Sequence, residues 1–354
     1  MNVLKTANLF LREQNACEYT EFGTGHINST FKITDTDKHE YILQHINKFV
    51  FKKPRELMYN LMQVTEFIRT KNPDPRSSLH FLKTSAGVPY TIDDDGEFWR
   101  MYAFVPDSVC YDRPTIEQFY ECGLAFGKFQ SNLCDFDASE LFETIPDFHN
   151  TPIRYTALCN AFMNDAFGRA TEVAEEIEFY NKHQKYYSLL IDANRDGRLP
   201  LRVSHNDTKC NNALLDSKTG KALCVIDLDT IMPGFSVTDF GDAIRFGAST
   251  AAEDEKDTSK IALDTDYFKS YTKGFLDGCG GKLPESELML LYDGAVMMTL
   301  ECGMRFLTDY LQGDVYFKTD YEGHNLVRAR SQIALAKDME KKRDEMMDFI
   351  KSLI

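Results

Sequence analysis

The chain has 354 residues, 43% of them hydrophobic and 27% charged, with a formal net charge of −15. Such a composition is ordinary for a soluble globular protein, and the length favours two lobes over one core. The negative charge argues against a nucleic-acid partner, because no basic surplus exists to neutralise phosphates. Nine cysteines without CxxC or zinc-type spacing predict reduced thiols. No apolar leader and no run of about 18 apolar residues occurs, so we expect a cytoplasmic monomer with no membrane partner.

The first hundred residues predict a strand-rich lobe with one helix. Short apolar segments separated by polar turns predict strands, and apolar residues recurring at helical spacing predict a helix over 54–70. The expected strands are 29–33, 41–46, 88–92 and 98–105. Closely spaced glycines interrupt the segment before the first of these strands.

After Pro106 helical patterns dominate, and the only clear strands form one hairpin. The expected helices are 115–133, 152–167, 172–190, 266–275, 284–310 and 325–353. We therefore expect an α+β protein with a small antiparallel-sheet lobe (1–104), a hinge (105–110) and a large helical lobe (111–354).

The segment from Ser204 to Asp229 carries the strongest chemical signal. Asp207 is a candidate general base, and Asn212 and Asp227 are candidate ligands for Mg²⁺, which prefers hard oxygen donors. Two apolar runs, 213–215 and 222–226, flank a polar turn and predict a hairpin. Symmetric pairing sets Asn212 opposite Asp227. The alternative is that Asp207 and Asn212 only cap turns.

Neighbouring polar residues are expected to support this site. His205 is predicted to hold the loop rather than act as an acid. Asp229 is either a second metal contact or a residue that orients the backbone. Asp239 and Asp242 are predicted to cap the next helix.

The glycine-rich turn around Gly23 and Gly25 is a weak signal alone, since such turns often serve only the chain reversal. Beside a metal site it predicts a loop whose backbone amides approach nucleotide phosphates. Kinase-type lobes usually add a lysine on the third strand, but this chain has Gln44 there. Lysines 48, 52 or 53 could supply the missing charge, or Mg²⁺ and the backbone could carry more of it.

Together these segments resemble the aminoglycoside phosphotransferase/choline kinase superfamily, and more closely its N-acetylhexosamine 1-kinase subfamily. The resemblance covers nearly the whole chain and rests on residues 23–28, 41–44, 201–209, 226–234, 239–250 and 301–307. It implies a two-lobed protein-kinase-like fold, with Mg²⁺ as cofactor and ATP as phosphate donor. It also implies transfer to the anomeric hydroxyl of N-acetylglucosamine or N-acetylgalactosamine. The glutamine at position 44 also resembles that subfamily.

The resemblance assigns Asp207 as base and Asn212 and Asp227 as metal ligands. It implies that the following residues contact the sugar or lie near it: His26, Arg305, Tyr316, Thr230 and Phe246. Nucleotide contacts are expected at Gly23, Gly25 and Gln44, at the hinge residues Ala103, Phe104 and Val105, and at Ile226 below the adenine. Two alternatives remain open: a kinase of the same fold for another small alcohol, such as an aminoglycoside, choline, homoserine or another hexose, and a nucleotide-binding pseudokinase.

Overall fold

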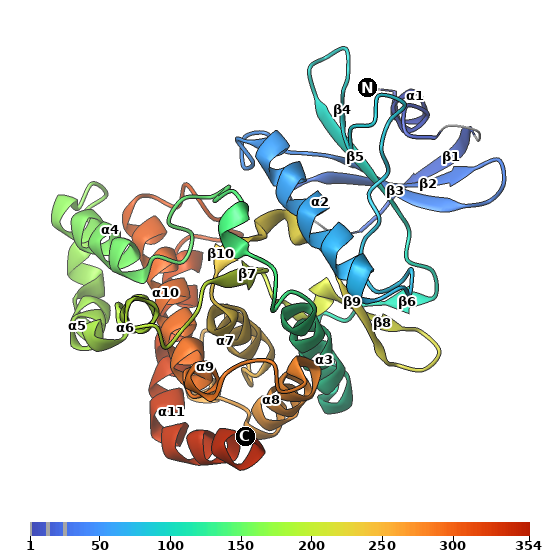
Figure 1. Ribbon diagram of the computed structural model, residues 1–354. Coiled ribbons are helices and arrows are strands. Elements are labelled where there is room, and N and C mark those ends of the chain that lie inside the picture. Colours follow the sequence, from blue (N-terminus) through green and yellow to red (C-terminus); the bar gives the residue numbers. More distant parts are fainter. Residues whose placement is uncertain (1, 12–14, 24–26) are drawn as a thin grey trace.

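The computed structural model describes residues 2–11, 15–23 and 27–354, which form two lobes. In Figure 1 the blue and teal sheet with helix α2 lies on one side, and most of the green-to-red helices lie on the other. The N-terminal lobe is an antiparallel sheet of order β1-β2-β3-β5-β4. Its elements are α1 (Val3–Ala7), β1 (Ala16–Glu21), β2 (Ser29–Asp35), β3 (Glu40–His45), α2 (Pro54–Lys71), β4 (Thr91–Ile92) and β5 (Phe98–Ala103).

The two faces of this sheet have different roles, because successive strand side chains point to opposite faces. One face packs with α1 into a small core that includes Phe31, Leu43 and Trp99. The residues next to them along each strand point to the opposite face. On that face Gln44 of β3 lies directly opposite Arg100 of β5 in the strand register. This second face therefore places polar side chains toward the other lobe.

The C-terminal lobe is mainly helical. Its helices are α3 (Ile116–Asn132), α4 (Thr151–Asn164), α5 (Ala174–Lys182), α6 (Leu189–Arg195), α7 (Ser236–Gly247), α8 (Thr265–Cys279), α9 (Glu285–Leu288), α10 (Leu291–Leu311) and α11 (His324–Leu353). None of the helices within the described ranges is long and apolar enough to cross a membrane. The expected two-lobed α+β architecture is confirmed.

Two of the expected helices are interrupted. The segment 172–190 is not one helix: α5 ends at Lys182, and the ring of His183 donates to the carbonyl of Phe179, 2.6 Å away. A side chain that satisfies a terminal carbonyl in this way favours a helix end. The segment 284–310 is divided into α9 and α10 by a tight turn, in which Leu290 N donates to Glu287 O.

The C-terminal lobe also has more strands than the expected hairpin. They are β6 (Ser108–Val109), β7 (Arg202–Ser204), β8 (Ala213–Asp216), β9 (Ala222–Val225) and β10 (Met232–Gly234). The hairpin β8–β9 is extended by β6, and β7 pairs with β10. The prediction of a single hairpin was wrong because two- and three-residue strands are too short to show periodicity.

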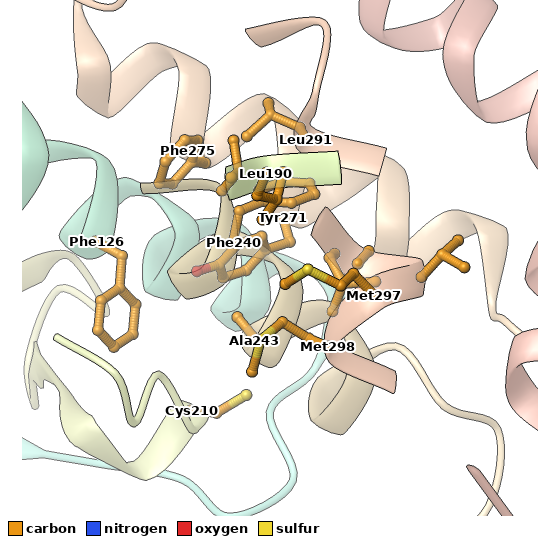
Figure 2. Packing of buried hydrophobic residues seen from close by; sticks show 14 of the residues in the cluster. Phe126, Leu190, Cys210, Phe240, Ala243, Tyr271, Phe275, Leu291, Met297 and Met298 are labelled. Atoms are coloured by element: carbon orange, nitrogen blue, oxygen red, sulfur yellow. The ribbon is translucent and has the colours of Figure 1, made fainter. Parts of the chain in front are cut away.

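A large apolar core underlies the segment between β7 and β8. Figure 2 shows Phe240 of α7 and Tyr271 of α8 at its centre, and their ring centroids are 5.7 Å apart. Cys210, which follows Asp207 by three residues, is buried in the same core. The backbone that carries the candidate base is thus anchored in close-packed side chains, which restrict its movement.

Helices α3 and α8 approach closely because glycines line their contact. A Cβ atom built on Gly274 would lie 2.0 Å from the carbonyl oxygen of Tyr120, and one on Gly123 would lie 2.4 Å from that of Tyr271. No real side chain tolerates such distances. The close approach brings α3, which packs against β8 and β9, firmly onto α8.

Candidate active site

The loop after β7 carries Asp207 and fixes its carboxylate through two neighbours. The Nδ2 of Asn212 donates to the Asp207 carbonyl at 2.8 Å and to its Oδ2 at 3.2 Å. The ammonium of Lys209 lies 3.1 Å from the other carboxylate oxygen. Burial opposes the charge of Lys209, but Asp207 and Asp242 outweigh it and raise the pKa of this lysine. The arrangement keeps Asp207 oriented while its remaining lone pairs stay available to accept a proton.

Asp239 of α7 holds this loop in place. Its Oδ1 accepts hydrogen bonds from Asn206 N and Ser204 Oγ, both at 2.8 Å. Its Oδ2 accepts from His205 N at 2.8 Å and from Gln130 Nε2 at 3.2 Å. Burial raises the pKa of Asp239 despite these donors. The bonds also stabilise the left-handed backbone at Asn206, whose φ is +63°, a conformation that asparagine tolerates better than most residues.

The expectation that Asp239 and Asp242 cap the next helix was wrong, because both lie inside α7 and face the loop instead. Asp242 accepts from Thr208 N at 3.2 Å and pairs with Arg245 at 2.9 Å. Burial opposes its charge, but Arg245, Lys209 and His149 together lower the pKa of Asp242.

His205 has the supporting role expected from the sequence. Its Nε2 donates to the carbonyl of Ile226 at 2.9 Å, and its ring packs edge-on against Phe126 with centroids 5.3 Å apart. The ring is buried. It therefore ties the loop to the segment that leads into Asp227.

The hairpin presents Asp227 beside this loop, but in a register that differs by one residue from the expected one. A bulge between Leu214 and Leu215 shifts the pairing, and Ile226 N donates to Asn212 O at 2.8 Å. Asn212 thus lies opposite Ile226 and not opposite Asp227. The prediction failed because the chain reverses between Lys218 and Thr219, where Asp216 N donates to Lys221 O across the turn, and not between Thr219 and Gly220. The bulge offsets one residue of the resulting two-residue shift. Asp227 itself adopts left-handed backbone with φ +57°.

The donors around Asp227 fit a hard divalent cation. Among the described residues none donates a hydrogen bond to its carboxylate, and the Oδ1 of Asn212 is equally free because Nδ2 makes the bonds to Asp207. Desolvation, followed by the charges of Asp229 and Asp207, raises the pKa of Asp227 to about 6. A cation would relieve this crowding of carboxylates. The described residues form no cluster of three or more His, Cys, Asp or Glu suited to a metal.

Asp229 has partners from the N-terminal lobe. It is buried, forms an ion pair with Arg100 of β5, and accepts from Asn28 Nδ2 at 2.6 Å. The backbone amide of Asn47 in turn donates to Asn28 Oδ1 at 2.9 Å. The side chain of Asp229 thus joins the two lobes, a role that the sequence did not reveal.

The residues expected at the nucleotide are partly in view. Gly23 has φ +80° and ends the first described part of the glycine-rich turn, whereas Gly25 lies outside the described residues. Phe104 meets Phe22 edge-on at 5.9 Å, and Ile226 is half-buried.

Of the three residues expected at the adenine, Ala103, Phe104 and Val105, one has a free backbone donor in the described chain. The amides of Ala103 and Phe104 are already bonded to His80 O and Glu40 O. The amide of Val105 has no such partner among the described residues. It is therefore the donor that an adenine ring could use.

Lys48 and Lys53, two of the lysines considered as substitutes for the missing charge at Gln44, have other partners. Gln44 Nε2 donates to Thr30 Oγ1 at 3.1 Å, and its Oε1 accepts from Arg100. Lys48 reaches the β4–β5 turn, where it bonds Gly96 O at 2.8 Å, and Lys53 pairs with Glu56. Neither lysine turns toward Gln44.

Arg305 of α10 is surrounded by aromatic rings. Its guanidinium lies 5.5 Å from the ring centroids of Phe148 and Phe317 and 6.0 Å from that of Tyr316. Within the described chain it has no hydrogen-bonded acidic partner, so its donors are free for a ligand. Tyr316 is 70% exposed. His26, the third residue expected at the sugar, lies outside the described residues.

The other two expected acceptor residues occupy different surroundings. Thr230 Oγ1 donates to His205 O at 2.6 Å, and its carbonyl accepts from Asn206 Nδ2 at 2.8 Å, so Thr230 braces the Asp207 loop. Phe246 lines a pocket of about 340 Å³ with Arg245 and Tyr267. Arg305, Tyr316 and Thr230, the other expected acceptor residues that the structure describes, do not line that pocket.

A buried carboxylate near Arg305, with two hydrogen-bond partners, was also not anticipated. Glu301, one helical turn before Arg305, accepts from His149 Nδ1 at 2.7 Å and from Thr151 Oγ1 at 2.5 Å. Burial opposes the charge of Glu301, but its partners lower the pKa of this carboxyl below its ordinary value. The partners come from a segment about 150 residues away, and no local pattern predicts such a contact.

Comparison with known proteins identifies the family and supports the fold. The family model of the phosphotransferase enzyme family (APH) matches residues 18–270. An aminoglycoside phosphotransferase from Alicyclobacillus acidocaldarius superposes with a TM-score of 0.63 at 11% identity, covering 96% of this chain and 93% of the other. A microcompartment-associated aminopropanol kinase gives 0.59 at 13% identity and 97% of both chains. An amicoumacin kinase, solved in complex with AMP-PNP, Ca²⁺ and Ami, gives 0.57 at 15% identity, covering 94% and 92%.

Proposed function

The chain belongs to the phosphotransferase enzyme family, and on that premise we propose that it transfers the γ-phosphate of ATP to the anomeric hydroxyl of N-acetylhexosamines. The products are the sugar 1-phosphate and ADP. The observation that carries the kinase chemistry is the grouping of Asp207, Asn212 and Asp227 around one loop and hairpin, with Asp227 lacking any donor in the described chain.

In this reaction Asp207 accepts the proton of the attacking hydroxyl. Asn212 and Lys209 hold its two carboxylate oxygens from one side, which orients the remaining lone pairs. Asn212 and Asp227 would hold Mg²⁺ through their side-chain oxygens. When bound, Mg²⁺ offsets the charge of the β- and γ-phosphate oxygens. The amide of Val105 and the apolar faces of Phe104 and Ile226 receive the adenine.

The acceptor side favours a neutral, oxygen-rich molecule over a cationic one. Arg305 offers planar donors among aromatic rings. A second cation lies nearby, because burial and then the charge of Arg305 lower the pKa of Arg154. The like charge of Arg305 disfavours a cationic alcohol at this position. The acidic residues Asp254, Glu255 and Asp257 lie instead on a separate loop. A sugar that stacks on Tyr316 and whose oxygens accept hydrogen bonds from Arg305 fits these surroundings.

Measuring ADP release over a panel of N-acetylhexosamines, other hexoses, choline, homoserine and aminoglycosides tests the acceptor assignment. Turnover restricted to one of the other alcohols would refute the sugar assignment while keeping the kinase.

The Asp207→Asn variant tests the base. We expect kcat to fall by about 10² to 10⁴, the usual contribution of a positioned base, with thermal stability and nucleotide affinity unchanged. Asp94→Asn, at a surface residue paired with Lys5, is the matched control. Near-full turnover in Asp207→Asn would show that another group accepts the proton.

A further inference from the structure

Arg100 lies at the position where the strand register brings β5 next to Gln44 of β3. The two residues are direct cross-strand partners. Nε and Nη2 of Arg100 both donate to Gln44 Oε1, at 2.9 and 2.7 Å. The neutral glutamine that occupies the usual lysine position is therefore bound by a cation one strand away.

The guanidinium is buried and permanently charged. Arg100 is 3% exposed, and arginine does not release its proton in proteins. A buried charge needs a partner, which is Asp229 from the other lobe. Asp229 follows Asp227 by two residues, so the charge of Arg100 acts close to the candidate metal site. Arg100 and Asp227 interact electrostatically.

The bonding pattern leaves two N–H donors of Arg100 unused. A guanidinium has five N–H hydrogens. Three are engaged, by Gln44 twice and by Asp229 once, which leaves one on each Nη among the described contacts. Gln44 likewise keeps one hydrogen of Nε2 after its bond to Thr30.

We propose that Arg100 is the phosphate-side cation of this site, moved from β3 to β5. It is a positioning residue: it neutralises Asp229, fixes the carboxamide of Gln44, and keeps a positive charge beside the nucleotide phosphates. The proposal rests on the proposed kinase function, but only on its nucleotide half and not on the identity of the acceptor.

The experiment compares nucleotide binding by calorimetry, with AMP-PNP and Mg²⁺ and no acceptor, across matched variants. Arg100→Met removes the charge at similar length. Arg100→Met combined with Asp229→Asn removes the pair without leaving a lone buried carboxylate. Arg100→Met combined with Gln44→Lys restores the cation on the opposite strand. Lys48→Met, four residues after Gln44 but turned to the β4–β5 turn, is the control.

We expect Arg100→Met with Asp229→Asn to keep a melting temperature close to wild type and still to weaken nucleotide binding about 10- to 100-fold, the range for losing a charged hydrogen-bond partner. Arg100→Met with Gln44→Lys should recover most of that loss, and Lys48→Met should change nothing. Where turnover is measurable, the KM for nucleotide should rise while the KM for the acceptor stays constant.

Wild-type affinity in the paired Arg100→Met/Asp229→Asn variant would overturn the proposal, because Arg100 would then only balance Asp229. A folded Arg100→Met/Gln44→Lys variant that recovers no affinity would overturn it as well. A wild-type protein that binds no nucleotide would refute the proposed kinase itself, whereas nucleotide binding without turnover of any sugar would refute only the acceptor assignment.

Discussion

Replacing Asp239 by asparagine tests whether a buried carboxylate in α7 holds the segment that carries Asp207. The carboxylate accepts four hydrogen bonds, two on each oxygen, from Asn206 N, Ser204 Oγ, His205 N and Gln130 Nε2. Asparagine has nearly the same shape but only one accepting oxygen. In either orientation its NH₂ group faces two donors.

The expected cost follows from those two lost bonds. Each buried donor left without an acceptor costs about 1 to 3 kcal/mol. Removing the charge recovers part of this, because burial disfavours the ionised form of Asp239 and raises its pKa. The Ser204 hydroxyl can also rotate and accept from the new NH₂ group. We therefore expect a net loss of about 2 to 4 kcal/mol in the free energy of unfolding.

Urea denaturation followed by circular dichroism measures this loss, and turnover measures the effect on the loop. We expect kcat to fall about 100-fold, because a displacement of about 1 Å at a catalytic group can have this effect. Asp257→Asn is a matched control, since Asp257 is an exposed helix cap bonded to Ser259 N and Oγ. A change below about 0.5 kcal/mol in Asp239→Asn, with normal kcat, would refute a scaffolding role for this carboxylate.

Three further outcomes are expected. Desolvation and its acidic neighbours raise the pKa of Asp227 to about 6. Protonation of Asp227 therefore contributes stability that is fully present below about pH 4 and is lost as the pH rises through about 6. Metal binding needs the anion, and protection against thermal unfolding by Mg²⁺ with AMP-PNP should be weaker at about pH 5.5 than at about pH 7.5; an equal pH effect in Asp227→Asn would contradict this. Arg305→Met should raise the KM for the sugar about 10-fold or more, as for loss of a charged hydrogen bond, with nucleotide affinity constant; a change confined to nucleotide affinity would exclude the assigned role. Gly274→Ala should destabilise the protein by about 1 to 3 kcal/mol through overpacking, because its Cβ would meet Tyr120 O at 2.0 Å; Lys273→Ala is the exposed control, and equal stability of the two variants would contradict the close helix contact.

Local spacing was enough to find the reactive segment. Asp207, Asn212 and Asp227 lie within 21 residues of each other, and the hairpin that connects them forms from neighbouring apolar runs and a polar turn. Hydrogen bonds between residues this close depend mainly on local backbone geometry. The hairpin register was wrong by one residue, because the chain reverses one residue earlier than predicted and a bulge offsets only part of that shift.

The helix boundaries were likewise predicted well where local periodicity sets them and poorly where a side-chain contact sets them. Helices α2, α3 and α11 agree closely with their apolar periodicity, because each turns a continuous face toward a core. Where the sequence predicted one helix over 172–190, a contact between the His183 ring and a backbone carbonyl ends α5. Periodicity alone does not register such a side-chain bond.

The sequence by itself determined the two-lobed α+β plan, the loop with Asp207, and the absence of a lysine at position 44. Only the tertiary structure decided what replaces that lysine and what supports the loop. Arg100 reaches Asp229 across 129 residues, and Asp239 reaches His205 across 34. Such partners are chosen by strand register and helix packing, which depend on the whole fold and not on spacing along the chain.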